Sequence, residues 1–506
     1  MNTFPAIGTC PDALFGIHPI SGVSVGTPYS LQSQQNHAAP QVAFRAARHS
    51  LTARWRCALV IGLLAMGVAA CGGGGGTSSS AGEIARTGKV LVPVGNGSDY
   101  GQSVSVQPDR RLLLAGYSRG AGNWDFSLIR LNADGSLDTG FASNGKIVMD
   151  IGSNTDDHGY SITVQSDRKI VVAGSSFHYD GGSTGSGIPT GYNIFALMRF
   201  NADGTVDSSF GSGGKLVTDF GRDSEGLNLT MQPDGKILVA GYSNSDFAVT
   251  RYNPDGSLDS SFGSGGKVVT NFGSLALASD EAHSIILQPD GKIVVSGTSN
   301  SGGTNNFAVA RYNPDGNLDS SFGSAGEVVT DFGSGKDDAG LSVTLQPDGK
   351  IVVAGESHSG ASSDFAVARY NSDGSLDASF GNGGKLVTHI GSGAYDGGRS
   401  IALQPDGKIL VAGFSDSGNY WNFAVVRYNL DGSLDSTFGS NGARVVDIGG
   451  NGYDIGQSIT VQHDGRIVVG GYSRLAGGDF DFSLIRLTPD GNLDTTFGEV
   501  ATNINK

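Results

Sequence analysis

Carboxylates recur along this chain at fixed distances from other polar residues, and they are its most obvious candidates for chemistry. An Asp stands eight residues before six of seven regularly spaced Gln residues, and a Ser follows it four residues later. These acids are Asp99, Asp157, Asp280, Asp338, Asp396 and Asp454, and the odd copy has Ser224 and Asn228 instead. A ring of such acids at the mouth of a channel could hold a cation such as Ca²⁺, which prefers oxygen ligands. The alternative is structural, with each Asp fixing a loop by hydrogen bonds to Ser or to the backbone.

A second set pairs an Arg with an Asp eight residues later. The Arg residues are Arg130, Arg199, Arg251, Arg311, Arg369, Arg427 and Arg486, and the Asp residues run from Asp138 to Asp494. We expect these pairs to form structural ion pairs across a turn. The turn itself, as at Asn253–Asp259, offers calcium-like oxygens but lacks the fuller ligand set of an EF-hand loop. This favours ordinary turn chemistry over a metal site.

Aromatic residues and one His stand where the otherwise regular sequence varies, and they are candidates for binding a sugar or a partner protein. They are Trp124, His178, Tyr179, Tyr192, Tyr420 and Trp421. Binding residues are frequently carried by variable loops on a rigid scaffold. The alternative is that these side chains are unselected surface or pack locally.

All these residues belong to a repeat that must position them. The phrase at Arg251–Gly263 recurs seven times and alternates with a second phrase, as at Leu345–Gly355. Each repeat contains four short apolar runs, here named strands a to d, separated by Asp-Gly turns and by longer loops. Tight turns favour antiparallel hairpins, and four such strands repeated around a ring describe a propeller blade. We therefore predict an all-β, seven-bladed β-propeller of four-stranded antiparallel blades.

The two ends of the repeat array predict how the ring closes. Gly88–Val94 matches a d strand such as Gly266–Thr270 but has no a, b or c strand before it, whereas the last repeat lacks a d strand. The N-terminal strand can therefore complete the last blade, a Velcro closure that removes exposed edges. In each blade, turns a–b and c–d open on one face and hardly vary, so we name it the constant face. Loops b–c and d–a open on the other, the variable face.

The N-terminal region has the features of an export signal. Residues 1–41 are expected to be disordered or spurious, with translation starting downstream near Val42 or Leu51. Residues 42–70 carry a basic and then an apolar segment of signal-peptide length. The end of this segment resembles a lipobox, so residues 71–87 are expected to be a lipidated Cys71 followed by a Gly/Ser tether, and residues 88–506 the propeller. Gly72, rather than Asp, follows Cys71, which resembles the pattern of lipoproteins directed to the bacterial outer membrane, on either its periplasmic or its outer side. The alternative is a simple secretory signal in which Cys71 is incidental.

The composition limits the possible partners. The net charge is −15, and the basic residues before position 70 make the remainder more acidic still. An acidic surface repels phosphate backbones, so nucleic-acid binding is not expected. The three cysteines, Cys10, Cys57 and Cys71, all precede the repeats, so the propeller has no internal disulfide. We expect a monomer attached to a membrane through its lipid.

The repeated frames, such as Gln404–Ile409 and Asn253–Asp259, closely resemble the delta-60 repeat family of bacterial exported proteins over residues 88–506. The resemblance implies a surface or secreted β-protein and brings no established activity, cofactor or catalytic residue. We expect a non-enzymatic protein that binds an envelope protein or glycan through its variable face. The alternatives are a lyase, lactonase or glycosidase that uses the channel-mouth acids, and a purely structural envelope component. Ca²⁺ is the only ion that the sequence suggests.

Overall fold

The computed structural model describes residues 86–498 except 121, 153, 184–188, 274–278, 334, 336, 361, 419, 451 and 476. The expected extension, the signal peptide, Cys71 and most of the tether lie outside the described residues, as does the tail 499–506. The described residues belong to the second of two units of the chain, Ser79–Lys506. A search of the described residues finds no helix with the length and apolar character needed to cross a membrane.

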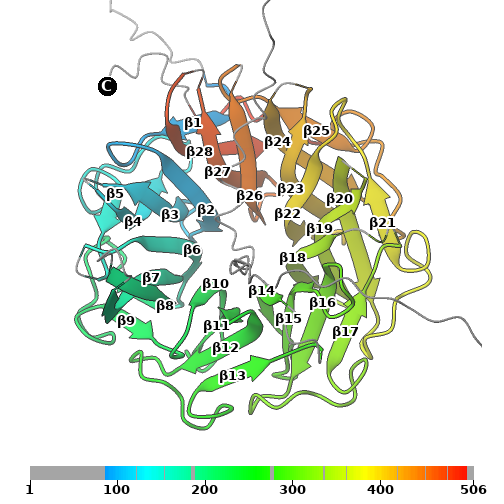
Figure 1. The fold of residues 1–506 in the computed structure, drawn as a ribbon. Helices are drawn as coiled ribbons and strands as arrows, with labels where there is room; N and C mark the ends of the chain where they lie inside the picture. Colours follow the sequence, from blue (N-terminus) through cyan, green and yellow to red (C-terminus); the bar gives the residue numbers. More distant parts are fainter. Residues whose placement is uncertain are drawn as a thin grey trace, which may run out of the picture. The chain divides into compact units, whose positions relative to one another are not determined.

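Seven sheets of four antiparallel strands surround a common centre, which confirms the predicted seven-bladed propeller (Figure 1). The inner a strands are β2 (Asp99–Val106), β6 (Asp157–Val164), β10 (Ser224–Met231), β14 (Asp280–Leu287), β18 (Asp338–Leu345), β22 (Asp396–Leu403) and β26 (Tyr453–Val461). The b strands are β3 (Leu112–Arg119), β7 (Ile170–Ser183), β11 (Ile237–Ser243), β15 (Ile293–Ser299), β19 (Ile351–Ser359), β23 (Ile409–Asp416) and β27 (Ile467–Arg474). The c strands are β4 (Trp124–Leu131), β8 (Pro189–Phe200), β12 (Asp246–Tyr252), β16 (Asn306–Tyr312), β20 (Ser362–Tyr370), β24 (Trp421–Tyr428) and β28 (Phe480–Leu487). The d strands are β5 (Lys146–Met149), β9 (Lys215–Thr218), β13 (Lys267–Thr270), β17 (Glu327–Thr330), β21 (Lys385–Thr388), β25 (Ala443–Val446) and, in blade 7, β1 (Lys89–Val92).

The middle strands of each blade are almost wholly buried, because neighbouring blades cover both of their faces. In β16, for example, every residue is buried. This explains why strands b and c read as near-continuous apolar runs, as strands covered on both faces do. Gly256 shows why the turn phrase needs Gly: its φ is +91°, and an added Cβ would lie 3.0 Å from the Phe210 ring of the preceding blade.

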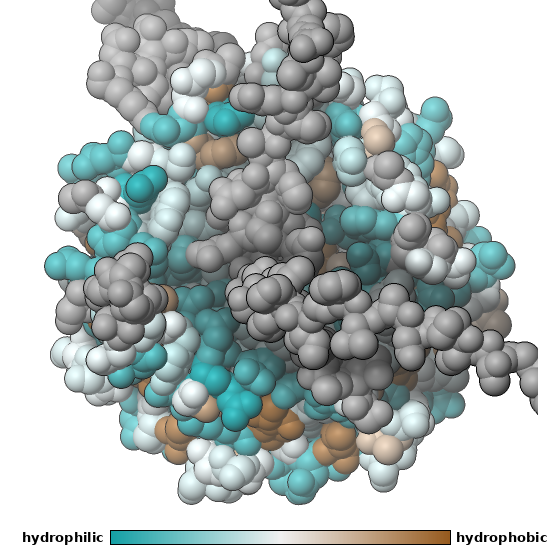
Figure 2. Space-filling model, viewed as in Figure 1, coloured by the Kyte–Doolittle hydropathy of each residue, from teal (hydrophilic) through white to brown (hydrophobic). Residues whose placement is uncertain are grey.

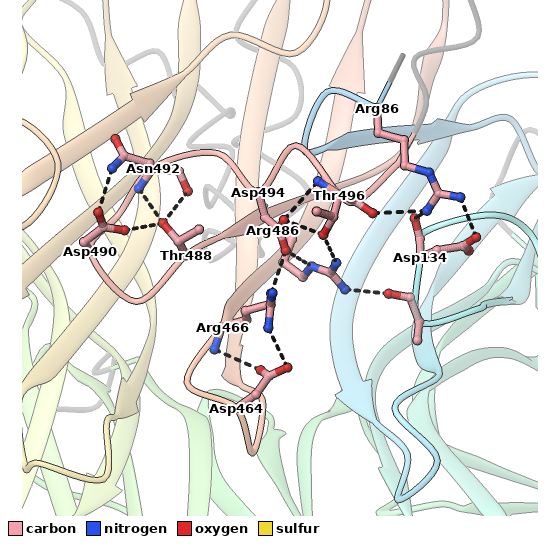
Figure 3. A network of polar contacts seen from close by, with 11 residues as sticks. Arg86, Asp134, Asp464, Arg466, Arg486, Thr488, Asp490, Asn492, Asp494 and Thr496 are labelled. Atoms are coloured by element: carbon pink, nitrogen blue, oxygen red, sulfur yellow. Dashed lines mark hydrogen bonds and ion pairs between the residues drawn. The ribbon is translucent and has the colours of Figure 1, made fainter. Parts of the chain in front are cut away.

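The N-terminal strand closes the ring as predicted. β1 pairs with β28, with Lys89 opposite Ile485 and Val92 opposite Phe482. The Gly88 N–H donates to the Phe497 carbonyl over 2.7 Å, and the Gly498 N–H donates to the Asp134 carbonyl of blade 1 over 2.8 Å. Figure 3 shows this seam from close by, with Arg86 bridging the last turn and blade 1 through Asp134. The first and last described parts of the propeller are thus joined.

The predicted Arg–Asp ion pair forms in all seven blades and also links neighbouring blades. In blade 4 the Arg311 Nε lies 2.7 Å from the Asp319 Oδ2. The Arg311 Nη1 donates to the carbonyl of Ser372 in blade 5, and its guanidinium lies 4.5 Å from the centre of the Phe322 ring. Lys292 adds a second cation 2.9 Å from the same carboxylate. The other pairs repeat this arrangement: Arg130–Asp138, Arg199–Asp207, Arg251–Asp259, Arg369–Asp377, Arg427–Asp435 and Arg486–Asp494.

A closed circle of seven hydrogen bonds joins the inner strands. The Ser that follows each inner Asp accepts a hydrogen bond from a backbone N–H of the next blade, as where Ile162 donates to the Ser103 Oγ over 3.3 Å. Asn228 does the same in the odd repeat, because its Oδ1 accepts from the Ile285 N–H over 3.1 Å. The donors at the remaining junctions are Leu229, Val343, Ile401, Ile459 and Val104. Ser458 of blade 7 accepts the bond from Val104 of blade 1, so the circle has no gap.

Candidate functional site

The six inner Asp residues are buried in the blades. Asp99 is 0% exposed, and its carboxylate accepts hydrogen bonds from the Val94 and Gly95 N–H groups of the preceding d–a loop. The same bond to the d–a loop is made by Asp157, Asp280, Asp338, Asp396 and Asp454. A Ser of strand b, such as Ser176 beside Asp157, supplies the side-chain contact in place of the Ser four residues later. These contacts favour the loop-fixing interpretation over a ring of acids open to a channel.

Two of these acids belong to clusters whose oxygens or nitrogens lie within 4.8 Å of one another. In one cluster His389 Nδ1 lies 2.9 Å from Asp364 and 3.0 Å from Asp396, so the ring can act as the cation. The hydrogen bond that His389 donates to Asp364 raises the pKa of His389 accordingly. The other cluster consists of Asp125, Asp150 and Asp157, where burial raises the pKa of Asp157 to about 7. Protonation of Asp157 therefore relieves the repulsion among these three acids.

The repeats differ most clearly at a ring of inner positions, here called the variable ring. It comprises three residues from each blade. The first follows the inner Asp in strand a, the second is the residue of strand b that pairs with it, and the third is the bulged residue of strand a, two positions after the first. The cross-strand pairs are Tyr100–Tyr117, His158–Ser175, Glu225–Tyr242, Glu281–Thr298, Ala339–Glu356, Gly397–Phe414 and Ile455–Tyr472. The bulged residues, which have no partner in the strand register, are Gln102, Tyr160, Leu227, His283, Leu341, Arg399 and Gln457.

The variable ring surrounds the centre of the propeller near the variable face. The a strands lie innermost in each blade (Figure 1) and adjacent a strands contact each other around the ring. The ring positions lie next to the inner Asp, where the d–a loop enters the strand. Bulges of this kind re-aim a side chain and are common beside binding sites. The fixed Gly and Asp residues thus hold seven sets of variable side chains at one end of the inner a strands.

Blades 3 and 4 of the variable ring each contribute one glutamate. Glu225 is 4% exposed and accepts a hydrogen bond from the Asn193 Nδ2 over 2.8 Å. Burial and the charge of Asp223 raise the pKa of Glu225 to about 7, and burial and Glu225 raise that of Glu281 to about 7. Neither glutamate has an ion-pair partner among the described residues. They can therefore hold or release protons near neutral pH.

Blades 4 to 6 carry a group of opposite charges. The Arg399 Nη2 lies 3.7 Å from the Glu356 Oε2, and His358 lies 3.9 Å from the other oxygen. Burial raises the pKa of Glu356, but Arg399 and His358 outweigh it, so the net shift is downward. Burial and then Arg399 lower the pKa of His283 to about 4, although blade 5 separates their strands. The charge of Arg399 in blade 6 therefore acts on His283 in blade 4.

Aromatic rings cover the remaining part of the variable ring, in blades 7, 1 and 2. Tyr100 lies 4.9 Å from Tyr472 and 5.2 Å from Phe480, measured between ring centres. Tyr117 lies 4.6 Å from the His158 ring, which is buried and whose Nδ1 has no hydrogen-bond partner. Burial lowers the pKa of His158 to about 4, so the ring is neutral at pH 7. Blades 7, 1 and 2 thus carry an aromatic cluster, whereas blades 3 and 4 carry Glu225 and Glu281.

The aromatic residues predicted from the loops divide into two groups. Trp124 packs on Tyr100 and Tyr117 at 5.5 and 5.4 Å, and Trp421 packs on Phe414 at 4.8 Å, so both border the variable ring. Tyr420 contacts Tyr453, which also contacts Trp421. By contrast, His178, Tyr179 and Tyr192 lie on a separate extension. The expected long loop at Phe177–Asn193 is instead largely a two-stranded continuation of β7 and β8, with His178 paired to Tyr192.

The variable ring contains residues that the loop-based reading of the sequence missed. The chain has six Glu residues, and three of them, Glu225, Glu281 and Glu356, lie in the ring. They stand inside strands, between fixed Asp, Gly and Ser residues, so a search limited to loops passes over them. Comparing the repeats column by column, with Glu treated as the rare acid, would have found all three.

The opposite pKa shifts of two ring glutamates predict opposite effects of the same substitution. For Glu225→Gln, we compare the free energy of unfolding of the variant with that of the wild type. The difference should shift in favour of the variant by about 1–3 kcal/mol between pH 4.5 and pH 8, since one pKa unit corresponds to about 1.4 kcal/mol. The reason is that a carboxyl with a raised folded pKa begins to destabilise above its unfolded pKa, and this penalty grows until pH passes the folded value. Glu356→Gln is the control and should lose stability relative to the wild type as pH rises. Urea unfolding at both pH values measures this, and equal profiles for the two variants would contradict it.

Comparison with known proteins yields a family for this chain and several solved structures with a weak similarity to it. No curated protein matches the sequence. A protein of unknown function from Dyadobacter fermentans has a similar structure, with TM-score 0.41, 10% identity, and coverage of 80% of this chain and 98% of that one. For a catalytically inactive virginiamycin B lyase from Staphylococcus aureus with quinupristin, the TM-score is 0.42 and the identity 11%, and the match covers 78% of this chain and 98% of that one. For the polysaccharide lyase Uly1, the TM-score is 0.43 and the identity 12%, and the match covers 78% of this chain and 90% of that one.

One family model matches every repeat, from the a–b turn to the c–d turn. The matched residues are 107–141, 165–210, 232–262, 288–322, 346–380, 404–438 and 462–497. Together they make up half of the chain, and they contain the Gln-Pro-Asp and Asp-Gly turn frames that build the constant face. The chain therefore belongs to the family described as domain of unknown function (DUF5122) beta-propeller.

Proposed function

We propose that this chain is an exported, lipid-anchored binding protein of the bacterial envelope, a member of the delta-60 type, whose ligand enters the channel mouth through the variable face. Cys71 would carry the lipid that holds it at the outer membrane. We expect a Cys71→Ser variant to leave the membrane fraction for the soluble fraction. Unchanged membrane attachment would contradict the lipid anchor.

The observation that carries the binding proposal is the contrast between two sets of positions. The inner Asp recurs in six repeats, the circle of Ser and Asn bonds in seven, and the Arg–Asp pairs in seven, as a scaffold requires. The variable ring lies within the same strands, yet it brings aromatic rings to one side and glutamates to the other. A scaffold alone gives no reason for such asymmetry.

The chemistry of the variable ring fits a glycan. Flat aromatic rings with one exposed face bind the apolar faces of sugars, while carboxylates and amides accept and donate hydrogen bonds to hydroxyl groups. Trp124 borders the variable ring and is half-buried, so part of its indole remains accessible, and Arg119 lies 5.7 Å from its ring centre. Toward the rim of the face drawn in Figure 2, hydrophobic residues form only separate patches among hydrophilic ones.

Binding to envelope glycans tests this proposal. The full chain should bind at least one glycan fraction of the envelope, and Trp124→Ala should weaken that binding tenfold or more, which corresponds to about 1.4 kcal/mol. Tyr179→Ala is the matched control, since Tyr179 is 50% exposed on the β7–β8 extension away from the variable ring. Equal losses in the two variants, or no binding to any glycan fraction, would contradict a glycan site at the channel mouth.

An enzyme is the second candidate, and one observation favours it. Glu225 and Glu281, with pKa values of about 7, are suited to proton transfer at neutral pH. A lyase, lactonase or glycosidase would use one of them as acid or base, with Arg399 offsetting charge on the substrate. Analysis of the glycan fractions after incubation with the full chain distinguishes the two candidates. An enzyme would release cleaved products, and the Glu225→Gln variant would fail to form them. A purely structural component would neither bind nor convert any of them.

A further inference from the structure

A polar cavity lies on the constant face, at the seam where blade 7 meets blade 1. Its volume is about 180 Å³, and its walls are Arg110, Ala133, Gln462, Asp464, Arg466 and Arg486. Figure 3 shows Arg466 and Arg486 approaching this place from blade 7, beside Asp464. Three of the six lining residues are arginines, in a chain whose net charge is −15.

Arg110 occupies a strained position that other blades give to Gly. Its φ is +70°, whereas the corresponding turn residues of blades 3 to 7 are glycines with φ between +82° and +85°: Gly235, Gly291, Gly349, Gly407 and Gly465. A side chain in this left-handed conformation costs about 1–3 kcal/mol, and such strain tends to persist where it serves a function. Arg110 therefore needs an explanation other than the geometry of the turn.

A second exchange accompanies the first and makes the space. In blade 3 the turn Gly235 faces Pro254, whose Cγ would lie 3.4 Å from an added Cβ. Blade 1 has Ala133 at the Pro254 position, so a smaller side chain stands beside the larger Arg110. The same pair of exchanges occurs once more, as Arg168 with φ +71° and Ala202 in blade 2.

The arginines at the seam carry more positive charge than their partners neutralise. The Arg466 Nη1 lies 2.8 Å from the Asp464 Oδ2, and its Nε lies 2.7 Å from the Asp494 Oδ2. The Arg486 Nε is bound to the same Asp494 oxygen over 2.8 Å. Arg110 is exposed and has no ion-pair partner among the described residues. Three guanidinium groups thus face two carboxylates, which leaves one positive charge at the cavity.

We propose that this cavity binds a tetrahedral oxyanion, a phosphate or sulfate group, between Arg110 and Arg466. The guanidinium of Arg110 presents two parallel N–H groups that match two oxygens of such an anion, while Arg466, whose Nη1 and Nε are bound to Asp464 and Asp494, adds its positive charge. The volume of about 180 Å³ is several times the roughly 30 Å³ occupied by one water molecule in the liquid, so the anion can enter with part of its hydration. The ligand is either a free ion or the phosphate group of a larger molecule.

Titration of the full chain with inorganic phosphate, and separately with a soluble sugar phosphate, tests the site. Calorimetry or ³¹P NMR at constant ionic strength should show one saturable site for at least one of them. The titrations use an Arg168→Gly background, so that the similar turn of blade 2 cannot contribute. Preference for inorganic phosphate would indicate a free ion, and preference for the sugar phosphate would indicate a phosphorylated ligand.

Arg110→Gly is the decisive variant, because it installs the residue of five other turns and should fold at least as well. We expect it to weaken binding tenfold or more while leaving the urea midpoint unchanged or higher. Arg222→Gly removes one exposed guanidinium from a d–a loop on the variable face and is the charge-matched control. Absence of binding by either ligand in the background chain, or an equal loss in both variants, would overturn the proposal.

Discussion

Replacing Asp319 with Ala is expected to lower the free energy of unfolding by about 3–5 kcal/mol, the cost of removing one partner from a buried ion pair. The substitution leaves Arg311, which is 5% exposed, beside Lys292 without the carboxylate that both contact. Arg311 also joins blade 4 to blade 5 through the Ser372 carbonyl, so its displacement should disturb two blades. Urea unfolding followed by tryptophan fluorescence and circular dichroism measures the loss.

The pH dependence of this loss separates the ion pair from simple packing. Burial raises the pKa of Asp319, but hydrogen bonds from Ser321 and Lys292 outweigh it and hold the value well below normal. The stabilisation by Asp319 is therefore complete above the unfolded pKa of about 4 and declines as pH falls below it. Asp315→Ala is the matched control: Asp315 is exposed, the hydrogen bonds of its side chain stay within the turn, and the loss of that side chain should cost only about 1 kcal/mol. Equal losses in the two variants would contradict the assigned role of the ion pair.

Placing Asp at Leu91 is expected to detach the closing strand and to cost about 3 kcal/mol or more. Leu91 is 4% exposed and packs with Val446 and Ile448 of blade 6. Removing a buried Leu forfeits about 1.5–3 kcal/mol of burial, and an unpaired carboxylate in the same place adds a further cost. Guanidinium unfolding measures the total, and hydrogen exchange along Lys89–Val92 reports the release of β1 itself.

Val329 provides the control for this substitution, because it occupies the same third position in the d strand β17 but is 42% exposed. Val329→Asp should change the stability by less than about 1 kcal/mol, as surface substitutions usually do. If Leu91→Asp were as mild as Val329→Asp, or if exchange at β1 stayed slow, the closure would not depend on this strand's apolar contacts.

The sequence predicted the fold well because each fold-determining feature is local and repeated. Asp-Gly turns, apolar runs of strand length and the unmatched strand at Gly88–Val94 are visible without any knowledge of contacts, and the Arg–Asp spacing of eight residues already implied a pair across a turn. Repetition strengthens each of these signals sevenfold.

The candidate site was less predictable because it depends on how blades meet. The bulge at Gln102 and its six counterparts arises in pairing between strands a and b, and no local pattern marks it. Ser103 was expected to contact the inner Asp, but its oxygen accepts from Ile162 of the next blade, a contact that exists only in the assembled ring. The unequal pKa shifts of Glu225 and Glu356 depend on neighbours from other blades in the same way.

The pairing of Lys89 with Ile485 also means that the last blade can be completed only late in synthesis of the chain. The strand that completes blade 7 is among the first parts of the propeller to leave the ribosome, and its partner is among the last. Until then, the nascent chain has an unmatched strand at one end and an unfinished blade at the other, both of which invite pairing with other chains. The similarity of the strands in the seven repeats favours wrong pairings between neighbouring nascent chains, so we expect this protein to depend on holding chaperones until synthesis ends.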